Sequence, residues 1–262
     1  MKRILLFFNK TSLFAFAAFL AVVLAQADEP AKVFNEANKL YEQGKFAEAA
    51  ATYDKLVQSG KISVPLLFNL GNAYLKSGQI GRAIVQYRRA EALAPRDPEI
   101  RANLEWARHR VAEAKNRQGV FAAIIKKLTL NEWTVLTFFA ITFWFAMLAI
   151  REWLPGWRNS FRGALIALGL AALLSGTCLV KAIFEQTIRR AVVVVPEAVI
   201  RRGPFQESQS IFTIRDGAEV EVINQKDDWV EIADSGRRTG WLPEAQTISV
   251  HGKPSRTLTK VD

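Results

Sequence analysis

The most informative part of the chain reads Leu67-Phe68-Asn69-Leu70-Gly71-Asn72-Ala73-Tyr74, and Ile80-Gly81-Arg82-Ala83-Ile84 comes shortly after it. Parts of this pattern recur when the sequence is aligned with itself at an offset of 34 residues. The offset pairs Asn35 with Asn69 and Asn103, Asn38 with Asn72, Gly44 with Gly78, Phe46 with Ile80, Ala49 with Ala83, and Tyr53 with Tyr87. Residues 30–118 therefore contain an internal repeat, which predicts an array of similar structural units.

The repeat length resembles that of the tetratricopeptide repeat (TPR), a helix–turn–helix unit of 34 residues. The second copy carries the TPR pattern at Leu67, Leu70, Gly71, Tyr74, Gly78, Ala83, Tyr87, Ala90 and Pro95. Gly71 and Ala83 are small where two antiparallel helices would cross closely. Gly78 lies where a helix C-terminus favours a left-handed residue, so it marks the turn between the two helices.

A third helical segment comes after the second copy. Asp97 is placed to cap it and Pro98 to occupy its first position. Apolar residues at helical spacing predict a helix from Pro98 to about Arg117 that covers the open face of the last repeat. The prediction is an all-α TPR solenoid over residues 28–118, with two repeats and a capping helix.

The resemblance to TPRs also implies a binding surface, because stacked repeats form a concave face that holds peptides or partner proteins. The expected partner-binding residues are Phe34, Asn38, Tyr41, Phe68, Asn69, Asn72, Leu75 and Trp106. Asn38 and Asn69 match the asparagines of TPRs that clamp a terminal carboxylate, but Phe34 and Glu99 stand where that clamp has lysine. Two alternatives remain: the asparagines bond neighbouring backbone and stiffen the helices, or Trp106 packs near Val120 and Phe121.

Three apolar segments indicate how the chain meets a membrane: Ile4–Leu24, Trp133–Ile150 and Gly163–Val180. The first comes after Lys2 and Arg3 and before Ala25-Gln26-Ala27, and these are the parts of a secretory signal peptide. We expect residues 1–27 to be that signal. An uncleaved N-terminal anchor is the alternative, and in both cases the TPR region is exported.

The two later segments predict a transmembrane helical hairpin, with helices over residues 133–150 and 163–184 and a linker over 119–132. Eighteen charge-free residues in each run would span about 27 Å, close to the bilayer core. The loop 151–162 has three arginines and one glutamate, which favours the cytoplasmic side. Two spans after an exported N-terminus return the chain to the periplasm, so both soluble domains are expected there.

Residues 191–250 change to short alternating runs with turns, which predicts five or six strands in a small all-β barrel. They resemble a bacterial SH3-like domain at Val199-Ile200-Arg201-Arg202-Gly203-Pro204, Asp216-Gly217-Ala218-Glu219-Val220-Glu221-Val222, Asp228-Trp229-Val230-Glu231-Ile232 and Arg238-Thr239-Gly240-Trp241-Leu242. Such domains bind cell-wall glycopeptide or protein ligands. Trp229 and Trp241 are the candidates for a ligand groove, and packing inside the barrel is the alternative. The polar tail is 251–262.

The composition argues against an enzyme. One cysteine, Cys178, excludes an internal disulfide and a multi-cysteine metal site. Two histidines, His109 and His251, make a histidine-based metal or catalytic centre a poor fit. Nucleotide-binding, hydrolase and metalloprotease motifs are missing from the sequence. We therefore expect no catalytic residues, no cofactor and no metal site.

The order of the parts resembles the BatE-type proteins of the Bacteroides aerotolerance (Bat) cluster. The stretch Leu67-Phe68-Asn69-Leu70-Gly71-Asn72-Ala73-Tyr74, with Ile80-Gly81-Arg82-Ala83-Ile84 and Asn103-Leu104-Glu105, is also similar to that group. The resemblance covers nearly the whole mature chain. It implies company with a MoxR-type AAA+ ATPase and membrane-bound von Willebrand factor A proteins, and a role in envelope integrity or stress tolerance.

These observations predict a non-enzymatic scaffold of the bacterial inner membrane whose TPR groove binds proteins, such as von Willebrand factor A-type Bat membrane proteins. The alternative is a cell-wall-binding module that holds peptidoglycan on the SH3-like domain. A net charge of +10 would suit a nucleic-acid binder, but export of both soluble domains argues against that class.

Overall fold

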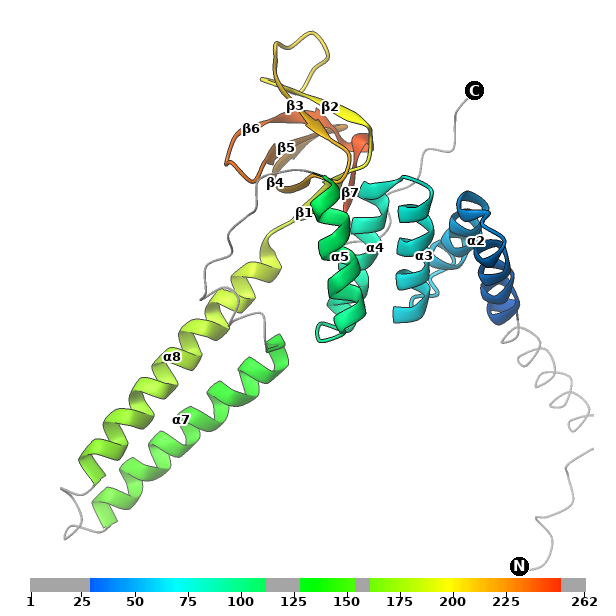
Figure 1. Ribbon diagram of the computed structural model, residues 1–262. Helices are drawn as coiled ribbons and strands as arrows, with labels where there is room; N and C mark the ends of the chain where they lie inside the picture. The colour runs from blue at the N-terminus through cyan, green and yellow to red at the C-terminus, as the bar shows by residue number, and fades with distance from the viewer. Residues whose placement is uncertain (1–28, 112–127, 154–160, 251–262) are drawn as a thin grey trace, which may run out of the picture.

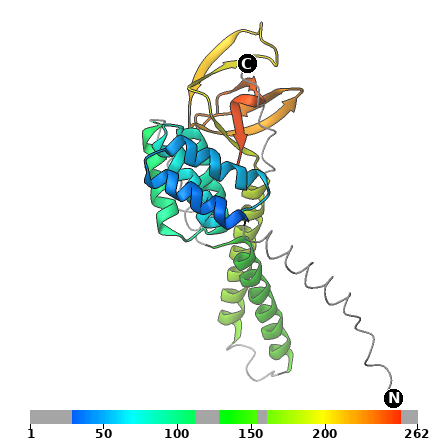
Figure 2. The ribbon, with the colours of Figure 1, turned by 90° about the vertical axis from the view of Figure 1, so that its right-hand side faces the viewer.

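The computed structural model describes residues 29–111, 128–153 and 161–250, which form a helical region, a helical hairpin and a β domain (Figures 1 and 2). The fold class predicted from the sequence is confirmed: a TPR-like region comes first, then the hairpin, then an antiparallel SH3-like domain. The predicted signal peptide and the polar tail lie outside the described residues, as do Val120, Phe121 and the rest of 112–127.

The TPR region, residues 29–111, is a row of antiparallel helices. A helix covers 29–42, and after it come α2 (Phe46–Gln58), α3 (Val64–Lys76), α4 (Ile80–Leu93) and α5 (Pro98–Arg110). Asp97 caps α5 as predicted, because its carboxylate accepts hydrogen bonds from the amides of Glu99 and Ile100. The part of the predicted capping helix beyond residue 111 is outside the described residues.

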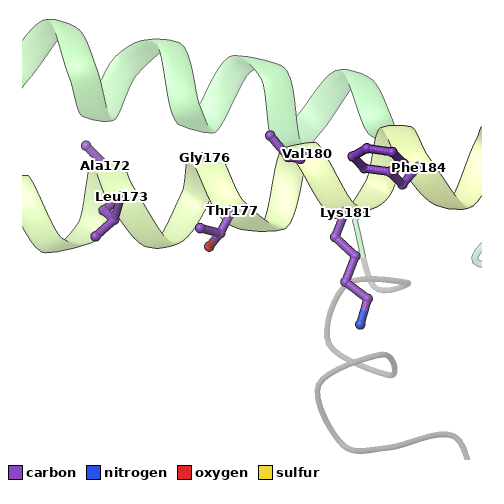
Figure 3. A pocket seen from close by; sticks show the side chains of 7 residues that line it. All are labelled: Ala172, Leu173, Gly176, Thr177, Val180, Lys181 and Phe184. Carbon is purple, nitrogen blue, oxygen red and sulfur yellow. The ribbon is translucent and has the colours of Figure 1, made fainter.

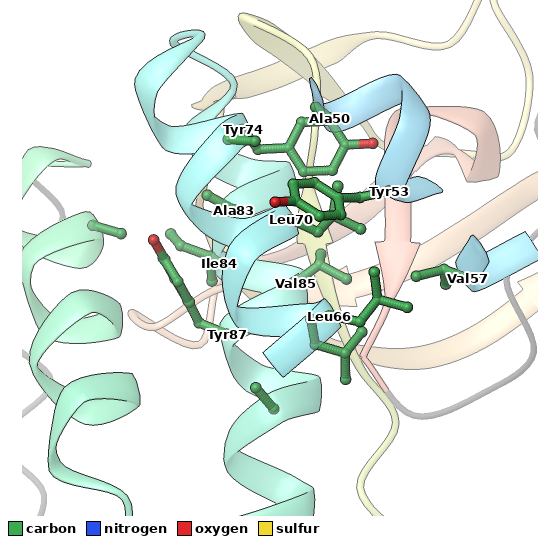
Figure 4. Close-up of a cluster of buried hydrophobic side chains, with 14 of the residues drawn as sticks. Ala50, Tyr53, Val57, Leu66, Leu70, Tyr74, Ala83, Ile84, Val85 and Tyr87 are labelled. Carbon is green, nitrogen blue, oxygen red and sulfur yellow. The ribbon is translucent and has the colours of Figure 1, made fainter. Parts of the chain in front are cut away.

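The core of the TPR region is built from the repeat residues (Figure 4). Tyr53 and Tyr87 are almost completely buried between helices, as is Leu70. Gly71 lies flat against the ring of Tyr87, so a Cβ there would come 2.6 Å from its Cε1 atom. Gly78 has φ 82°, which is the left-handed turn conformation that the sequence predicted.

The hairpin consists of α7 (Leu130–Trp153) and α8 (Phe161–Thr187), which lie side by side and project away from the other two parts (Figures 1 and 2). Both helices are long and apolar enough to cross a membrane, and little of their surface is buried. They extend beyond the predicted spans, because each span was predicted to end beside a charged residue. At the start of α7, Thr129 and Glu132 exchange hydrogen bonds in a capping box, so the helix tolerates this charge.

Two glycines of α8, Gly169 and Gly176, have different surroundings. A Cβ at Gly169 would meet the indole of Trp144 at 3.2 Å, so this glycine lies at the α7–α8 contact. At Gly176 the corresponding space is open. This glycine lies instead in a shallow, mainly apolar notch that runs along α8 from Ala172 to Phe184 (Figure 3).

The β domain is one seven-stranded antiparallel sheet with the order β3-β2-β6-β5-β4-β1-β7. Its strands are β1 (Arg190–Val193), β2 (Glu197–Arg201), β3 (Ser210–Arg215), β4 (Glu219–Lys226), β5 (Trp229–Ala233), β6 (Thr239–Pro243) and β7 (Thr247–Ser249). The sequence predicted five or six strands, and β7 was not among them. This strand pairs with β1 and completes the sheet.

The TPR region and the β domain are in contact, although the sequence predicted them as separate units. Strands β1 and β7 pack on α4, and Val192 and Val250 belong to the same buried cluster as the TPR core. The hairpin begins and ends beside this pair of domains (Figure 1). Because they touch, the TPR region and the β domain must lie on the same side of any membrane that the hairpin crosses.

Candidate protein-binding surfaces

Two matching hydrogen-bond networks connect the helices of the TPR region. In the first, the Tyr53 hydroxyl donates to Asn38 Oδ1 at 2.5 Å, and Asn69 Nδ2 donates to the same oxygen at 3.3 Å. In the second, the Tyr87 hydroxyl donates to Asn72 Oδ1 at 2.6 Å, and Asn103 Nδ2 donates to it at 3.0 Å. Each residue of the second network lies 34 positions after its counterpart in the first, so the network recurs with the repeat.

These networks fix the orientation of two side-chain amides. Because both bonds of Asn38 and Asn72 are accepted by the Oδ1 atom, the Nδ2 group of each points the other way. Neither Nδ2 group has a hydrogen-bond partner among the described residues, and both side chains are only partly buried. The TPR region therefore presents two similarly held amide donors, which suit the backbone carbonyls of a bound segment.

Aromatic side chains accompany the amides in the same register. Phe34 packs on the ring of Tyr53 with centroids 5.6 Å apart, and Phe68 packs on Tyr87 at 6.1 Å. Trp106 differs from them because 48% of its surface is exposed, and the guanidinium of Arg110 lies 4.0 Å from its ring centroid. Trp106 is thus the large exposed aromatic of this region, held in place by a cation–π contact.

The structure places the predicted partner-binding residues on the first helices of the repeats, and it specifies what several of them touch. Asn38, Asn69 and Asn72 bond side chains of other helices, whereas the sequence-based alternative had them bond neighbouring backbone. Tyr41 and Leu75 are partly buried against the core. Asn103 completes the second network but was not predicted as a site residue, although the offset that pairs it with Asn69 could have indicated it.

The two tryptophans of the β domain lie on the outer face of the sheet. Trp229 pairs with Pro243, and Trp241 pairs with both Glu231 and Arg201, and directly paired residues point to the same side. The intervening residues of β5 and β6 point inward and are buried. Both indoles are half-buried on this outer face and do not pack inside the barrel, which was the alternative drawn from the sequence. Trp241 lies beside Arg201 and Glu231, and Trp229 lies beside Pro243.

In the part of the chain that the structure describes, no three His, Cys, Asp or Glu side chains are grouped so as to hold a metal ion. Cys178 is a buried free thiol on α8, packed near Trp133. What the surfaces offer is aromatic rings, amide donors and isolated charges, which bind ligands by contact.

Comparison with known families finds two matches in the chain. A model of the bacterial SH3 domain matches residues 194–247, and a model of the TPR repeat matches residues 71–104. No curated protein was found to match this chain. The SH3 match falls within the β domain, and the TPR match runs from the middle of α3 through α4 into α5. The chain therefore combines a TPR region, a hairpin of two long apolar helices and a bacterial SH3 domain.

Proposed function

We propose that this protein is a non-enzymatic scaffold that binds a protein partner on the concave face of its TPR region. The observation that supports this most is the repeated Asn–Tyr network, which holds the Nδ2 donors of Asn38 and Asn72 in equivalent positions. Two donors in the same register suit an extended polypeptide, because its carbonyls recur along the chain. Trp106 adds an exposed indole, the kind of side chain that carries much of the energy in protein interfaces.

The proposed location is the bacterial inner membrane, with the TPR region and SH3-like domain in the periplasm. The two apolar helices support membrane association, and the apolar N-terminal segment with its Ala25-Gln26-Ala27 supports export. The resemblance to BatE-type proteins points to von Willebrand factor A-type membrane proteins as partners and to a MoxR-type ATPase in the same system. The role would then be in the stress tolerance of the cell envelope.

The expected result for Trp106→Ala is loss of the partner from the full-length protein purified from membranes, while the melting temperature stays unchanged. The reason is that the Trp106 indole is largely exposed, so its removal takes away contact area for a partner and little internal packing. Phe205→Ala is the matched control, since Phe205 is a similarly exposed aromatic on the β domain. If Trp106→Ala lowers the melting temperature and the partner is retained, Trp106 has a structural role.

A second candidate function has its own observation. The outer-face position of Trp229 and Trp241 leaves their indoles open to a ligand, and stacking on sugar or peptide groups would suit peptidoglycan. Under this alternative, Trp241→Ala would weaken muropeptide binding to the full-length protein while partner co-purification persists. The two functions are separated by which tryptophan, Trp106 or Trp241, each binding activity needs.

A further inference from the structure

Side chains from three helices meet at the junction between the two TPRs. The Tyr74 hydroxyl on α3 donates to Asp54 of α2 at 2.8 Å. The guanidinium of Arg82, from the second helix of the same repeat, lies 5.7 Å from the centroid of the Tyr74 ring. A second helix thus covers this tyrosine and places a positive charge near the carboxylate of the preceding repeat.

The equivalent positions one repeat later are both arginines. An offset of 34 residues takes Asp54 to Arg88 on α4, and it takes Tyr74 to Arg108 on α5. Two arginines in place of an aspartate–tyrosine pair would repel each other unless an anion lay between them.

Glu219 of the β domain supplies the anion. Arg88 donates from Nε and Nη2 to Glu219 Oε2 at 2.9 and 2.6 Å, and Arg108 donates from Nε to Oε1 at 2.6 Å. Burial alone would raise the pKa of Glu219, but the two guanidiniums outweigh this effect and lower the pKa to about 2. The contribution of this carboxylate to stability is therefore present above the usual glutamate pKa, and it is lost only as the pH falls toward 2.

The contacts around Glu219 are those of a packed interface. Asp216 accepts hydrogen bonds from the amide of Gly81 at the start of α4, at 3.2 and 3.1 Å. A Cβ at Gly217 would collide with Val111, the residue after α5, so the β domain approaches this helix end closely. Val192, Ile248 and Val250 add apolar contact with the TPR core. The β domain thus touches both α4 and α5, as the second helix of a repeat would.

We propose that the SH3-like domain is the structural cap of the TPR array, held on α4 and α5 by Glu219 and Asp216. The partner of the surface formed by α4 and α5 is then this chain's own β domain, and that surface is unavailable to other proteins. Trp106 of the proposed groove lies on α5, and Glu219 holds α5 through Arg108. The groove therefore depends on a residue outside it to stay ordered. The contact between the β domain and the TPR array does not depend on what the groove binds.

Reversal of one charge tests the proposal in the full-length protein. Glu219→Arg would place three guanidiniums together, so amide hydrogen exchange in α4 and α5 should accelerate by about tenfold or more. The matched control is Glu221→Arg, which makes the same change two residues along β4 at an exposed position. Glu221→Arg should leave exchange in α4 and α5 within about twofold of the wild-type rate.

Two further variants keep the test decisive if Glu219→Arg folds poorly. Glu219→Gln, which removes the charge but keeps the size, should accelerate exchange in the same two helices to a smaller extent. The charge swap Arg88→Glu with Glu219→Arg should restore part of the lost protection. The proposal is overturned if exchange in α4 and α5 is unchanged in Glu219→Gln and Glu219→Arg, or if Glu221→Arg accelerates it equally.

Discussion

Gly71→Leu is expected to unfold the second repeat of the full-length protein. A Cβ at this position would come 2.6 Å from Tyr87 Cε1, closer than such atoms approach. The Tyr87 ring has little room to retreat, because it is fully buried and its hydroxyl is bonded to Asn72. Overpacking costs about 1–3 kcal/mol in cores that can adjust, and we expect more than about 3 kcal/mol here. The melting temperature should fall by about 12 °C or more.

The control for this substitution adds the same side chain where there is room. Ala51 is exposed on α2, and Ala51→Leu should change the melting temperature by less than about 2 °C. Circular dichroism of both variants, with the TPR helices followed separately by hydrogen exchange, gives the comparison. A Gly71→Leu protein that melts like the wild type would contradict the helix crossing at this position.

The second large effect concerns membrane topology, where the expected result is all or none. Alkaline phosphatase fused after residue 118 or after residue 250 should be active, because this enzyme needs export and both fusion points would be periplasmic. A fusion within the loop 151–162 should be inactive. The export signal and the two apolar helices predict these outcomes. The contact between Glu219 and Arg88 further requires the two soluble parts to share a compartment.

The three fusions together can contradict two separate statements. Inactivity after both residue 118 and residue 250, with activity in the loop 151–162, would place the soluble parts in the cytoplasm and refute the proposed location. Activity after only one of residues 118 and 250 would contradict the contact between the TPR region and the β domain.

The helices of the TPR region could be predicted in detail because their signals are local. Gly78 and Asp97 each act within their own turn or helix, and the period of 34 residues reports the same unit twice. The hairpin was also predicted, since a long apolar run is a strong signal. Its ends were not, because a capping box such as the one formed by Thr129 and Glu132 lets a charged residue begin an apolar helix.

The contact between the TPR region and the β domain could not be predicted from the sequence. Glu219 meets Arg88 and Arg108 across separations of 131 and 111 residues, and no local pattern reports such pairings. Glu219 looks like any polar residue that begins an alternating strand. In hindsight the offset of 34 residues held a clue, because it places Arg88 and Arg108 where the first repeat junction has Asp54 and Tyr74.

The helices that carry the candidate binding residues could be predicted, but the contacts of their side chains could not. Repeat periodicity located Asn38 and Asn72 on the first helices, but which oxygen accepts from Tyr53 or Tyr87 depends on the packing of neighbouring helices. The outward direction of Trp241 likewise depends on its pairing with Arg201 in a distant strand. Strand alternation alone gives two faces and does not say which one is inside.

Site-specific photocrosslinking in living cells tests the proposed binding surface most directly. A photoreactive amino acid at Phe68 would stand on a first helix beside the Asn72–Tyr87 network, and the same group at Ala51 would stand on the exposed side of a second helix. We predict that position 68, and not position 51, crosslinks to a membrane-anchored protein with a von Willebrand factor A domain. Absence of any crosslink from position 68, or equal crosslinking from both positions, would contradict a protein-binding groove on the TPR region.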